Sequence, residues 1–284
     1  PSNTKAYYSF DIGNIHFLSL DSYGMEENSL RLYDTLAPQV NWIKKDLEAN
    51  KNKGWIVAYW HHPPYTMGSH NSDKERELVK IRENFIQILE RYGVDLILCG
   101  HSHLYERSKL MAGHYGPQQN FDSIKHNISS SSALYNGSNN SCPYVKNNGE
   151  TKGAVYVVSG SAGQLAGVQT TYPHKAMFYS DNTVSGAAMI EVQGNRLDVK
   201  WIATDGKIRD QFTMMKNVNK KTTVKLRKGQ KAKLTASFVG KYKWSHTKES
   251  TRDIEITPRA GKSIYTVQDE FGCVQDKFEV IVAK

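Results

Sequence analysis

The chain has 284 residues, of which 39% are hydrophobic and 23% charged, a globular composition with room for one large or two smaller domains. No stretch approaches the roughly 18 consecutive apolar residues of a membrane-spanning helix, so no membrane span is predicted. The net charge of +9 is uneven, because residues 1–216 hold 22 basic and 21 acidic residues (+1) and residues 217–284 hold 15 and 7 (+8). The basic residues of this tail are spread out, which favours a solvated surface, and no nucleic-acid motif accompanies them.

Apolar runs and turn signals predict alternating strands and helices over the first hundred residues. Gly13-Asn14 supplies a hairpin turn, Pro38 suits the first turn of a helix, and Ser72-Asp73 can cap a second helix. The predicted elements are hairpin strands at residues 7–12 and 15–20, a helix at 38–50, a strand at 56–60, a helix at 74–92 and a strand at 94–99. The last three form a βαβ unit, so its two strands are expected to be parallel neighbours.

Histidine clusters follow both strands of this βαβ unit. His-His-Pro-Pro-Tyr occupies residues 61–65, and Gly-His-Ser-His occupies residues 100–103. Parallel neighbours would place both clusters at the carboxyl edge of the sheet, where α/β folds bind ligands. Neutral imidazole is a common ligand of divalent metals, and two ions about 3.5–4 Å apart form the clamp used in phosphate ester hydrolysis. Ordinary polar loop histidines are the alternative, but two clusters at two strand ends favour a metal site.

The two clusters resemble the last two metal motifs of the purple acid phosphatases and their calcineurin-like relatives. The second cluster continues as Tyr-Glu-Arg-Ser at residues 105–108, and the resemblance covers about residues 5–213. It implies that His61 and His101 bind a divalent metal and that His103 binds the other ion. It also implies a cofactor of two metal ions, Fe with Zn, Mn or Fe, and that His70 faces the substrate phosphate and protonates the leaving group.

The choice between His61 and His62 as the ligand rests on the motif's spacing. The family often has valine three residues before the ligand, where this chain has Ala58. The family also places proline two residues after the ligand, which matches Pro63 and favours His61. We therefore expect the side chains of His61, His101 and His103 to converge, while His62 points away or supports the ligands from behind.

The earlier motifs of this family, an Asp, a Gly-Asp pair and an Asn-His pair, are absent. Because bridging carboxylates charge such a site and fix the metal spacing, three histidines alone would be a poor dinuclear centre. The chain also begins at Pro1 without Met. We therefore expect the carboxyl-terminal part of a longer enzyme, an αββα-type α/β sandwich incomplete at its amino end and inactive alone.

Three functions follow from these motifs. The first is metal-dependent hydrolysis of phosphate esters by the full-length parent, with a phosphate ester as substrate. The alternative is a secreted or cell-surface binding or attachment protein on a phosphoesterase scaffold. Cleavage of nucleotides or nucleic acids by the same chemistry is a third, because metal motifs do not encode the leaving group.

The region after the second cluster is less regular. Residues 112–152 are rich in Ser, Asn and Gly and predict a long loop that could form part of the substrate cleft, with His114 and His126 as loop residues. Strands are expected at residues 154–158, 187–192 and 197–204, with Gly194-Asn195 turning between the last two. The resemblance places these last strands in a second sheet.

The tail from about Asn217 has the rhythm of a β-sandwich. Its predicted strands lie at residues 223–226, 232–237, 242–244, 254–256, 263–268 and 278–282. The motifs Tyr242-x-Trp244 and Gly272-Cys273 resemble small immunoglobulin-like modules on secreted Bacteroidetes proteins. This resemblance divides the chain into a phosphoesterase domain at residues 1–216 and an all-β module at residues 217–284. It implies a secreted, periplasmic or cell-surface location and contact of the module with the cell surface or the secretion machinery.

The three cysteines give no evident disulfide framework, because their number is odd. Cys99 lies in a predicted strand and is expected to be buried, whereas Cys142 and Cys273 fall in different regions. The immunoglobulin-like modules often carry an early cysteine that pairs with the late one. Arg227 stands near that early position here, so Cys273 is expected to be unpaired.

Overall fold

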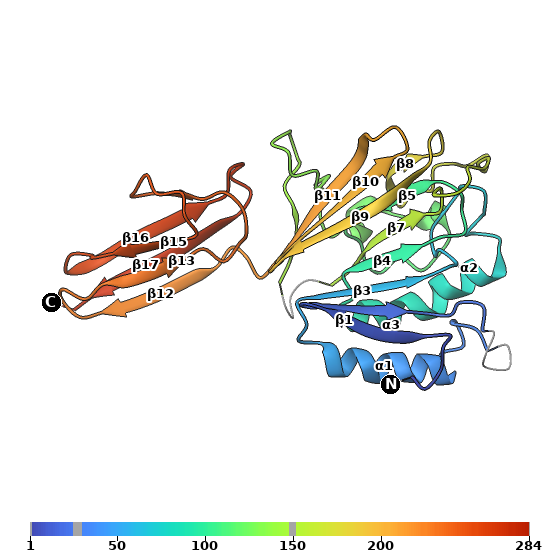
Figure 1. The fold of residues 1–284 in the computed structure, drawn as a ribbon, viewed down its shortest axis with the longest axis horizontal. Coiled ribbons are helices and arrows are strands. Elements are labelled where there is room, and N and C mark those ends of the chain that lie inside the picture. The colour runs from blue at the N-terminus through green and yellow to red at the C-terminus, as the bar shows by residue number, and fades with distance from the viewer. Residues whose placement is uncertain (1, 25–29, 148–151, 284) are drawn as a thin grey trace. The chain divides into compact units, whose positions relative to one another are not determined.

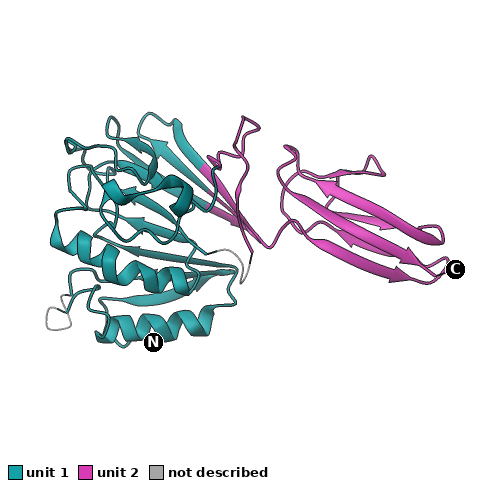
Figure 2. Ribbon diagram, turned by 180° about the vertical axis from the view of Figure 1, so that it is seen from behind, with its two compact units in different colours: residues 1–130, 152–190, 199–211 teal, residues 131–151, 191–198, 212–284 magenta. Residues whose placement is uncertain are grey.

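The computed structural model describes residues 2–24, 30–147 and 152–283 and shows a mixed α/β fold that is mostly sheet (Figure 1). The chain divides into two compact units (Figure 2). Unit 1 consists of residues 1–130, 152–190 and 199–211, and unit 2 of residues 131–151, 191–198 and 212–284. The boundary predicted between residues 216 and 217 falls inside unit 2 and remains a prediction.

The main sheet of unit 1 has seven strands in the order β1-β2-β3-β4-β7-β5-β8. Its strands are β1 (Tyr8–Ile12), β2 (Ile15–Ser19), β3 (Trp55–Trp60), β4 (Leu96–Cys99), β5 (Tyr105–Ser108), β7 (Val155–Ser159) and β8 (Met177–Asp181). The predicted hairpin is confirmed as the antiparallel pair β1 and β2, with Gly13 at a φ of +58° in its turn. The predicted βαβ unit is also confirmed, because β3 and β4 pair in parallel. Strands β5 and β8 were not predicted.

Helices cover one face of this sheet. Helix α1 (Pro38–Asn50) has the predicted bounds, and the second helix consists of α2 (Arg76–Lys80), a π-helical turn (Ile81–Phe85) and α3 (Ile86–Arg91) (Figure 1). The apolar face of these helices packs on alternate residues of the central strands; this core includes Val40, Ile43, Phe85, Leu89, Ile56, Ala58 and Ile97. The predicted cap is wrong, since Glu75 occupies the N-cap position of α2. The Ser72 hydroxyl instead donates to the Thr66 carbonyl at 3.0 Å.

A second sheet has the order β6-β11-β10-β9. Its strands are β6 (Tyr144–Lys146), β9 (Gly186–Gln193), β10 (Arg196–Ala203) and β11 (Ile208–Lys216), of which β9 and β10 match the predicted pair. Within unit 1 it is joined to the main sheet by Trp201, which stacks on Tyr105 with ring centroids 4.5 Å apart. The buried Arg107 reinforces the joint by donating from Nε and Nη2 to the Asp210 carboxylate at 2.6 and 2.8 Å.

The segment predicted as a long loop is more ordered than expected. It contains a 3₁₀ turn (Gln118–Asn120) and helix α4 (Ser123–His126), so the loop prediction for His126 is wrong. His114 does lie in a loop, but its side chain is buried. Residues 131–147 then cluster with unit 2. The segment is therefore packed structure over most of its length, and its predicted part in a substrate cleft is untested.

All six strands predicted for the tail are present. They are β12 (Lys221–Leu226), β13 (Ala232–Thr235), β14 (Lys243–Trp244), β15 (Asp253–Ile256), β16 (Gly261–Gln268) and β17 (Gln275–Val282). They form a four-stranded sheet in the order β12-β17-β16-β14 and a two-stranded sheet of β13 and β15. Their inward side chains, including Leu234, Trp244 and Phe278, form a second core. The immunoglobulin-like identity of this module remains a prediction.

The prediction that Cys273 is unpaired is wrong. Cys142 and Cys273 form a disulfide between residues 131 positions apart, both in unit 2. Any partner for Cys273 was expected within the tail, by resemblance to the immunoglobulin-like modules. The actual partner, Cys142, lies in the Ser- and Asn-rich segment that belongs to unit 2 together with the tail. Cys99 is the buried free cysteine, as predicted.

The disulfide leads to a stability prediction. Replacing Cys142 and Cys273 together by Ser should lower the free energy of unfolding of unit 2 by about 2–5 kcal/mol, because the cross-link closes a long loop and restricts the unfolded chain. The free energy of unfolding is measured by urea denaturation, monitored with a spectroscopic signal that arises from unit 2. Dithiothreitol should destabilise the wild type and leave the double variant unchanged. Equal stability of the two oxidised proteins would contradict the prediction.

The buried histidine His174 leads to a pH prediction. Its Nδ1 accepts from the Ala176 N–H at 3.0 Å, and burial, with smaller contributions from Arg82 and His114, lowers the pKa of His174 to about 3. The unfolded chain takes up the proton near pH 6.5. Between these values the unfolded state binds more protons, so stability should fall with decreasing pH by about 1.4 kcal/mol per pH unit for this group.

The variant His174→Asn keeps an acceptor for Ala176 and removes this titration. Urea denaturation between pH 7 and pH 4.5 should therefore show a shallower loss of stability in the variant. Parallel slopes for the wild type and His174→Asn would contradict the assignment.

Candidate metal centre

The candidate site lies where β3 and β4 end. The parallel register pairs Trp60 with Cys99, so His61 and Gly100 are the first residues beyond each strand. The Gly100 N–H donates to the His61 carbonyl at 3.1 Å and ties the two loops together. A Cβ atom at Gly100 would lie 3.4 Å from His61 Nδ1, an ordinary van der Waals contact, so the two motifs lie directly against each other. The strand pairing itself therefore sets the distance between the two histidine motifs.

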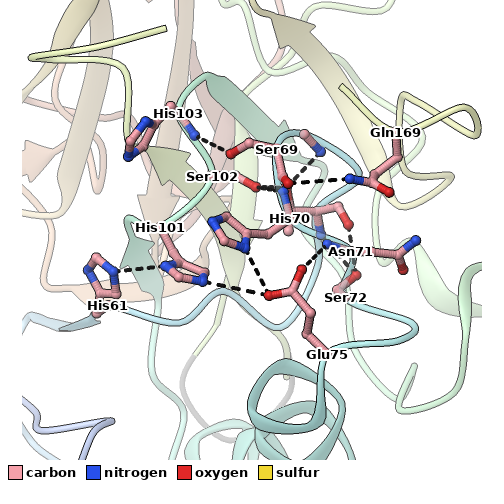
Figure 3. A network of polar contacts seen from close by, with 12 residues as sticks. His61, Ser69, His70, Asn71, Ser72, Glu75, His101, Ser102, His103 and Gln169 are labelled. Carbon is pink, nitrogen blue, oxygen red and sulfur yellow. Dashed lines mark hydrogen bonds and ion pairs between the residues drawn. The ribbon is translucent and has the colours of Figure 1, made fainter. Parts of the chain in front are cut away.

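The rings of His61 and His101 converge, as predicted (Figure 3). His61 Nε2 lies 3.0 Å from His101 Nδ1. The backbone of His101 has a φ of +68°, a left-handed conformation that residues other than Gly rarely adopt. Such local backbone strain is often found at functional sites, and here it accompanies the turn that aims the His101 ring at His61.

His62 is buried beside this pair. Its Nδ1 lies 2.9 Å from the Ser22 hydroxyl, and the Tyr23 ring packs edge-on against it with centroids 4.6 Å apart. Burial, and then the charge of His101, lowers the pKa of His62 to about 4. The rings of His61 and His62 both lie 4.8 Å from the His101 ring between centroids. Because His61 is exposed and His62 is buried, His61 is the member of the pair that faces the open side of the site.

The electrostatics of the site favour neutral imidazoles. Burial, followed by the neighbouring His70 and His61, lowers the pKa of His101 to about 4. Burial also lowers the pKa of His61, with smaller contributions from His70 and His103. Neutral imidazole is the form that binds a metal ion, so these groups need not release protons at neutral pH.

His70 lies directly against His101. The two rings stack with centroids 3.5 Å apart and an interplanar angle of 23°. The loop that carries His70 is held by the buried Ser102 hydroxyl, which accepts from the Thr66 hydroxyl at 2.7 Å and from the His70 N–H at 3.2 Å. Ser102, between the two histidines of the second motif, thus connects the motifs below the surface.

Sequence reasoning missed Glu75 as a member of this site. Its Oε2 lies 2.8 Å from His70 Nδ1 and 3.7 Å from His101 Nε2 (Figure 3). Ligand atoms of His70, Glu75 and His101 all lie within 4.8 Å of one another, close enough to hold a cation. The only sequence signal was an acidic residue at the expected helix start, which is common there for reasons of helix capping alone.

His103 lies on the other side of its loop. Figure 3 shows its ring apart from the His61–His101 pair. Its backbone is fixed by an N–H bond to the Ser69 hydroxyl at 3.1 Å and by its carbonyl, which accepts from the Ala166 N–H at 3.2 Å. The structure therefore brings His61, His70 and His101 together, whereas the predicted convergence of His103 with them is not seen (Figure 3). Side chains on either side of Ser102 can face different parts of the site.

Glycine packing holds the second motif in place. A Cβ at Gly160 would lie 2.1 Å from the Ser102 carbonyl oxygen, so no side chain fits there. Gly160 also donates its N–H to the Leu104 carbonyl at 3.1 Å. At Gly68 a Cβ would lie 2.3 Å from Leu104 Cδ2. Both glycines therefore allow a close approach to residues of the second motif that a side chain would prevent.

Comparison with known proteins gives the site a family context. Residues 3–105 match the family model of the calcineurin-like phosphoesterases. The chain is 39% identical to purple acid phosphatase 15 of Arabidopsis thaliana over 110 residues, 38% of this chain and 19% of that protein. It is 29% identical to acid phosphatase type 7 of Homo sapiens over 174 residues, 57% of this chain and 34% of that protein. The matched parts thus span between a fifth and a third of these relatives.

A solved structure is also similar in fold. The purple acid phosphatase isolated from yellow lupin (Lupinus luteus) seeds superposes with a TM-score of 0.55 at 18% sequence identity. The superposition covers 74% of this chain and 32% of that one. At this identity the likeness concerns the fold alone. The match to the calcineurin-like phosphoesterase family covers both histidine motifs, and this part of the chain resembles the purple acid phosphatases.

Proposed function

We propose that the protein hydrolyses phosphate esters with the help of bound metal ions. The observation that carries the proposal is the convergence of His61 and His101 at 3.0 Å, with His70 stacked on His101. Imidazoles from two loops meet at the carboxyl edge of a parallel sheet, within the region that matches the phosphoesterase family. The similarity to purple acid phosphatases supports the same reaction class.

The residues present fit a metal ion. His61 and His101 offer nitrogen donors, and both are neutral at neutral pH because burial lowers the pKa of each. Two ions are proposed, Fe with Zn, Mn or Fe, with His61 and His101 holding the divalent one and His103 the other. When bound, they would supply Lewis acidity toward the phosphoryl oxygens. The remaining carboxylate, Asn and His ligands are proposed to come from chain that precedes Pro1 in the parent.

The side chains of this chain would orient the ester and move one proton. His70 is proposed to face the phosphate and to donate a proton to the leaving alcohol, a step typically worth about 10²–10⁴-fold in rate. The loop carrying it is held by Ser102, and the Gln169 amide donates to the neighbouring Ser69 carbonyl at 3.3 Å. These contacts keep the loop that carries His70 in place before the ester binds, which avoids an ordering cost during the reaction.

A secreted, periplasmic or cell-surface location is proposed. The Cys142–Cys273 disulfide supports it, because such bonds persist in oxidising compartments. Among the described residues no helix is long and apolar enough to cross a membrane. Residues 217–284 are proposed to be an immunoglobulin-like module that contacts the cell surface or the secretion machinery.

A binding or attachment protein on a phosphoesterase scaffold is the second candidate. Among the described residues, the one cluster of three potential metal ligands holds a single carboxylate, Glu75, and this favours the binding protein. The sequence of the parent upstream of Pro1 discriminates the two. Upstream Asp, Gly-Asp and Asn-His motifs support the enzyme, whereas their absence supports the binding protein.

The metal proposal is tested by variants of the three histidines at the strand ends. His101→Ala should weaken zinc or manganese binding to the 284-residue chain by more than about 100-fold, because it removes a ligand rather than a residue that supports one. In the parent it should abolish most p-nitrophenyl phosphate turnover. His62→Asn should cost less in both measurements, about 10-fold, because it acts from behind the ligand.

The exposed His246 in unit 2 supplies the control, and His246→Ala should leave binding and turnover at the wild-type level. Calorimetry measures binding, and metal analysis of the purified parent checks its stoichiometry. A parent that binds no metal, or a His101→Ala variant with full binding, would refute the centre.

A further inference from the structure

We propose that Glu75 is a positioning residue that fixes the tautomer and direction of the His70 ring. The inference rests on the proposed function, in which His70 faces the phosphate. The proposal rests on geometry. The Glu75 carboxylate contacts the His70 ring at 2.8 Å, and the backbone N–H groups of both residues are hydrogen-bonded. The carboxylate would determine which ring nitrogen of His70 is free to meet the substrate.

Both oxygens of Glu75 are engaged by two residues of the loop before α2, His70 and Asn71. Oε1 accepts from the Asn71 N–H at 2.6 Å, and Oε2 lies 2.8 Å from His70 Nδ1. The Glu75 N–H in turn donates to the Asn71 carbonyl at 2.9 Å. At the N-cap of α2, Glu75 is therefore fixed at its backbone and at both ends of its carboxylate, and it can hold an imidazole in one orientation.

The contact selects one tautomer. A carboxylate only accepts hydrogen bonds, so the proton on His70 must reside on Nδ1. Nε2 then carries the lone pair in the neutral ring and the transferable proton in the charged ring. Stacking on His101, with centroids 3.5 Å apart, fixes the plane of the ring. Figure 3 shows the second ring nitrogen of His70 directed away from Glu75, toward the side on which His103 lies.

Metal ligation by Glu75 is the competing interpretation, since its Oε2 also lies 3.7 Å from His101 Nε2. The distances favour positioning. The contact with His70 is 0.9 Å shorter (3.7 minus 2.8 Å), and the other oxygen is already occupied by the Asn71 N–H. A carboxylate that ligated an ion would have to exchange at least one of these bonds.

The first test reads the tautomer directly in the metal-free 284-residue chain at pH 8. Long-range ¹H–¹⁵N spectra distinguish the two neutral forms of histidine, and loss of signals in His70→Gln assigns the ring. The wild type should show the form protonated at Nδ1. Glu75→Ala should shift the population toward protonation at Nε2, the form that an unrestrained histidine prefers. Glu75→Gln keeps an acceptor oxygen and should restore the wild-type form.

Glu77→Ala is the matched control, because Glu77 is the acidic residue in the first turn of the same helix. It should leave the His70 spectrum unchanged while altering the charge at the helix start equally. Circular dichroism of each variant verifies that α2 is intact. An unchanged His70 tautomer in a folded Glu75→Ala variant would overturn the proposal.

The second test uses the parent with its metals bound. Glu75→Ala should lower kcat about 10–100-fold, the usual cost of removing a residue that orients a functional imidazole, with KM and metal content unchanged. In the double variant with His70→Gln the loss should be no greater than in His70→Gln alone. Loss of metal on Glu75→Ala would instead identify Glu75 as a ligand and overturn the proposal. A parent inactive toward phosphate esters would refute the proposed function and leave the tautomer result standing.

Discussion

The parallel pairing of β3 with β4 is the constraint on which the site depends. It brings two segments about 40 residues apart in sequence to one edge of the sheet, and the Gly100 N–H bond to the His61 carbonyl extends the pairing one residue beyond the strands. A slip of one residue in this register would turn His101 away from His61, because successive residues of a strand face opposite sides. The apolar core beneath, built on alternate strand residues, prevents that slip.

Polar contacts then convert two neighbouring loops into one rigid surface. The buried Ser102 receives hydrogen bonds from Thr66 and from the His70 backbone, while Gly160 allows the next strand's loop to approach the Ser102 carbonyl. The imidazoles on top are crowded and partly desolvated, which keeps His101 neutral. A metal-binding histidine must be neutral and held in a fixed orientation. The packing of these two loops provides both conditions, which agrees with the proposed chemistry.

In unit 2 the strands can be predicted from the local sequence, whereas the disulfide pairing cannot. The six tail strands follow from alternation and turn residues, and each formed close to its predicted place. Their disulfide partner does not come from the tail, since Cys142 lies in a segment inserted between strands of the other unit. A pairing of cysteines depends on distance in space, and no pattern within residues 217–284 could reveal a partner 131 positions away.

The sequence by itself determined the elements with strong periodicity, namely the hairpin, α1, the βαβ unit and the tail strands, because burial of alternate or helically spaced apolar residues dictates them. The resemblance carried by the two histidine motifs also predicted His61, His70, His101 and His103 as site residues, and the structure brings the first three together. Only the tertiary structure decided which contacts Glu75 and Ser102 make. An acidic residue at a helix start and a serine between histidines have ordinary local explanations. The turn before α2 places the Glu75 carboxylate against the His70 ring, and the approach of the two loops places the Ser102 hydroxyl against the His70 N–H.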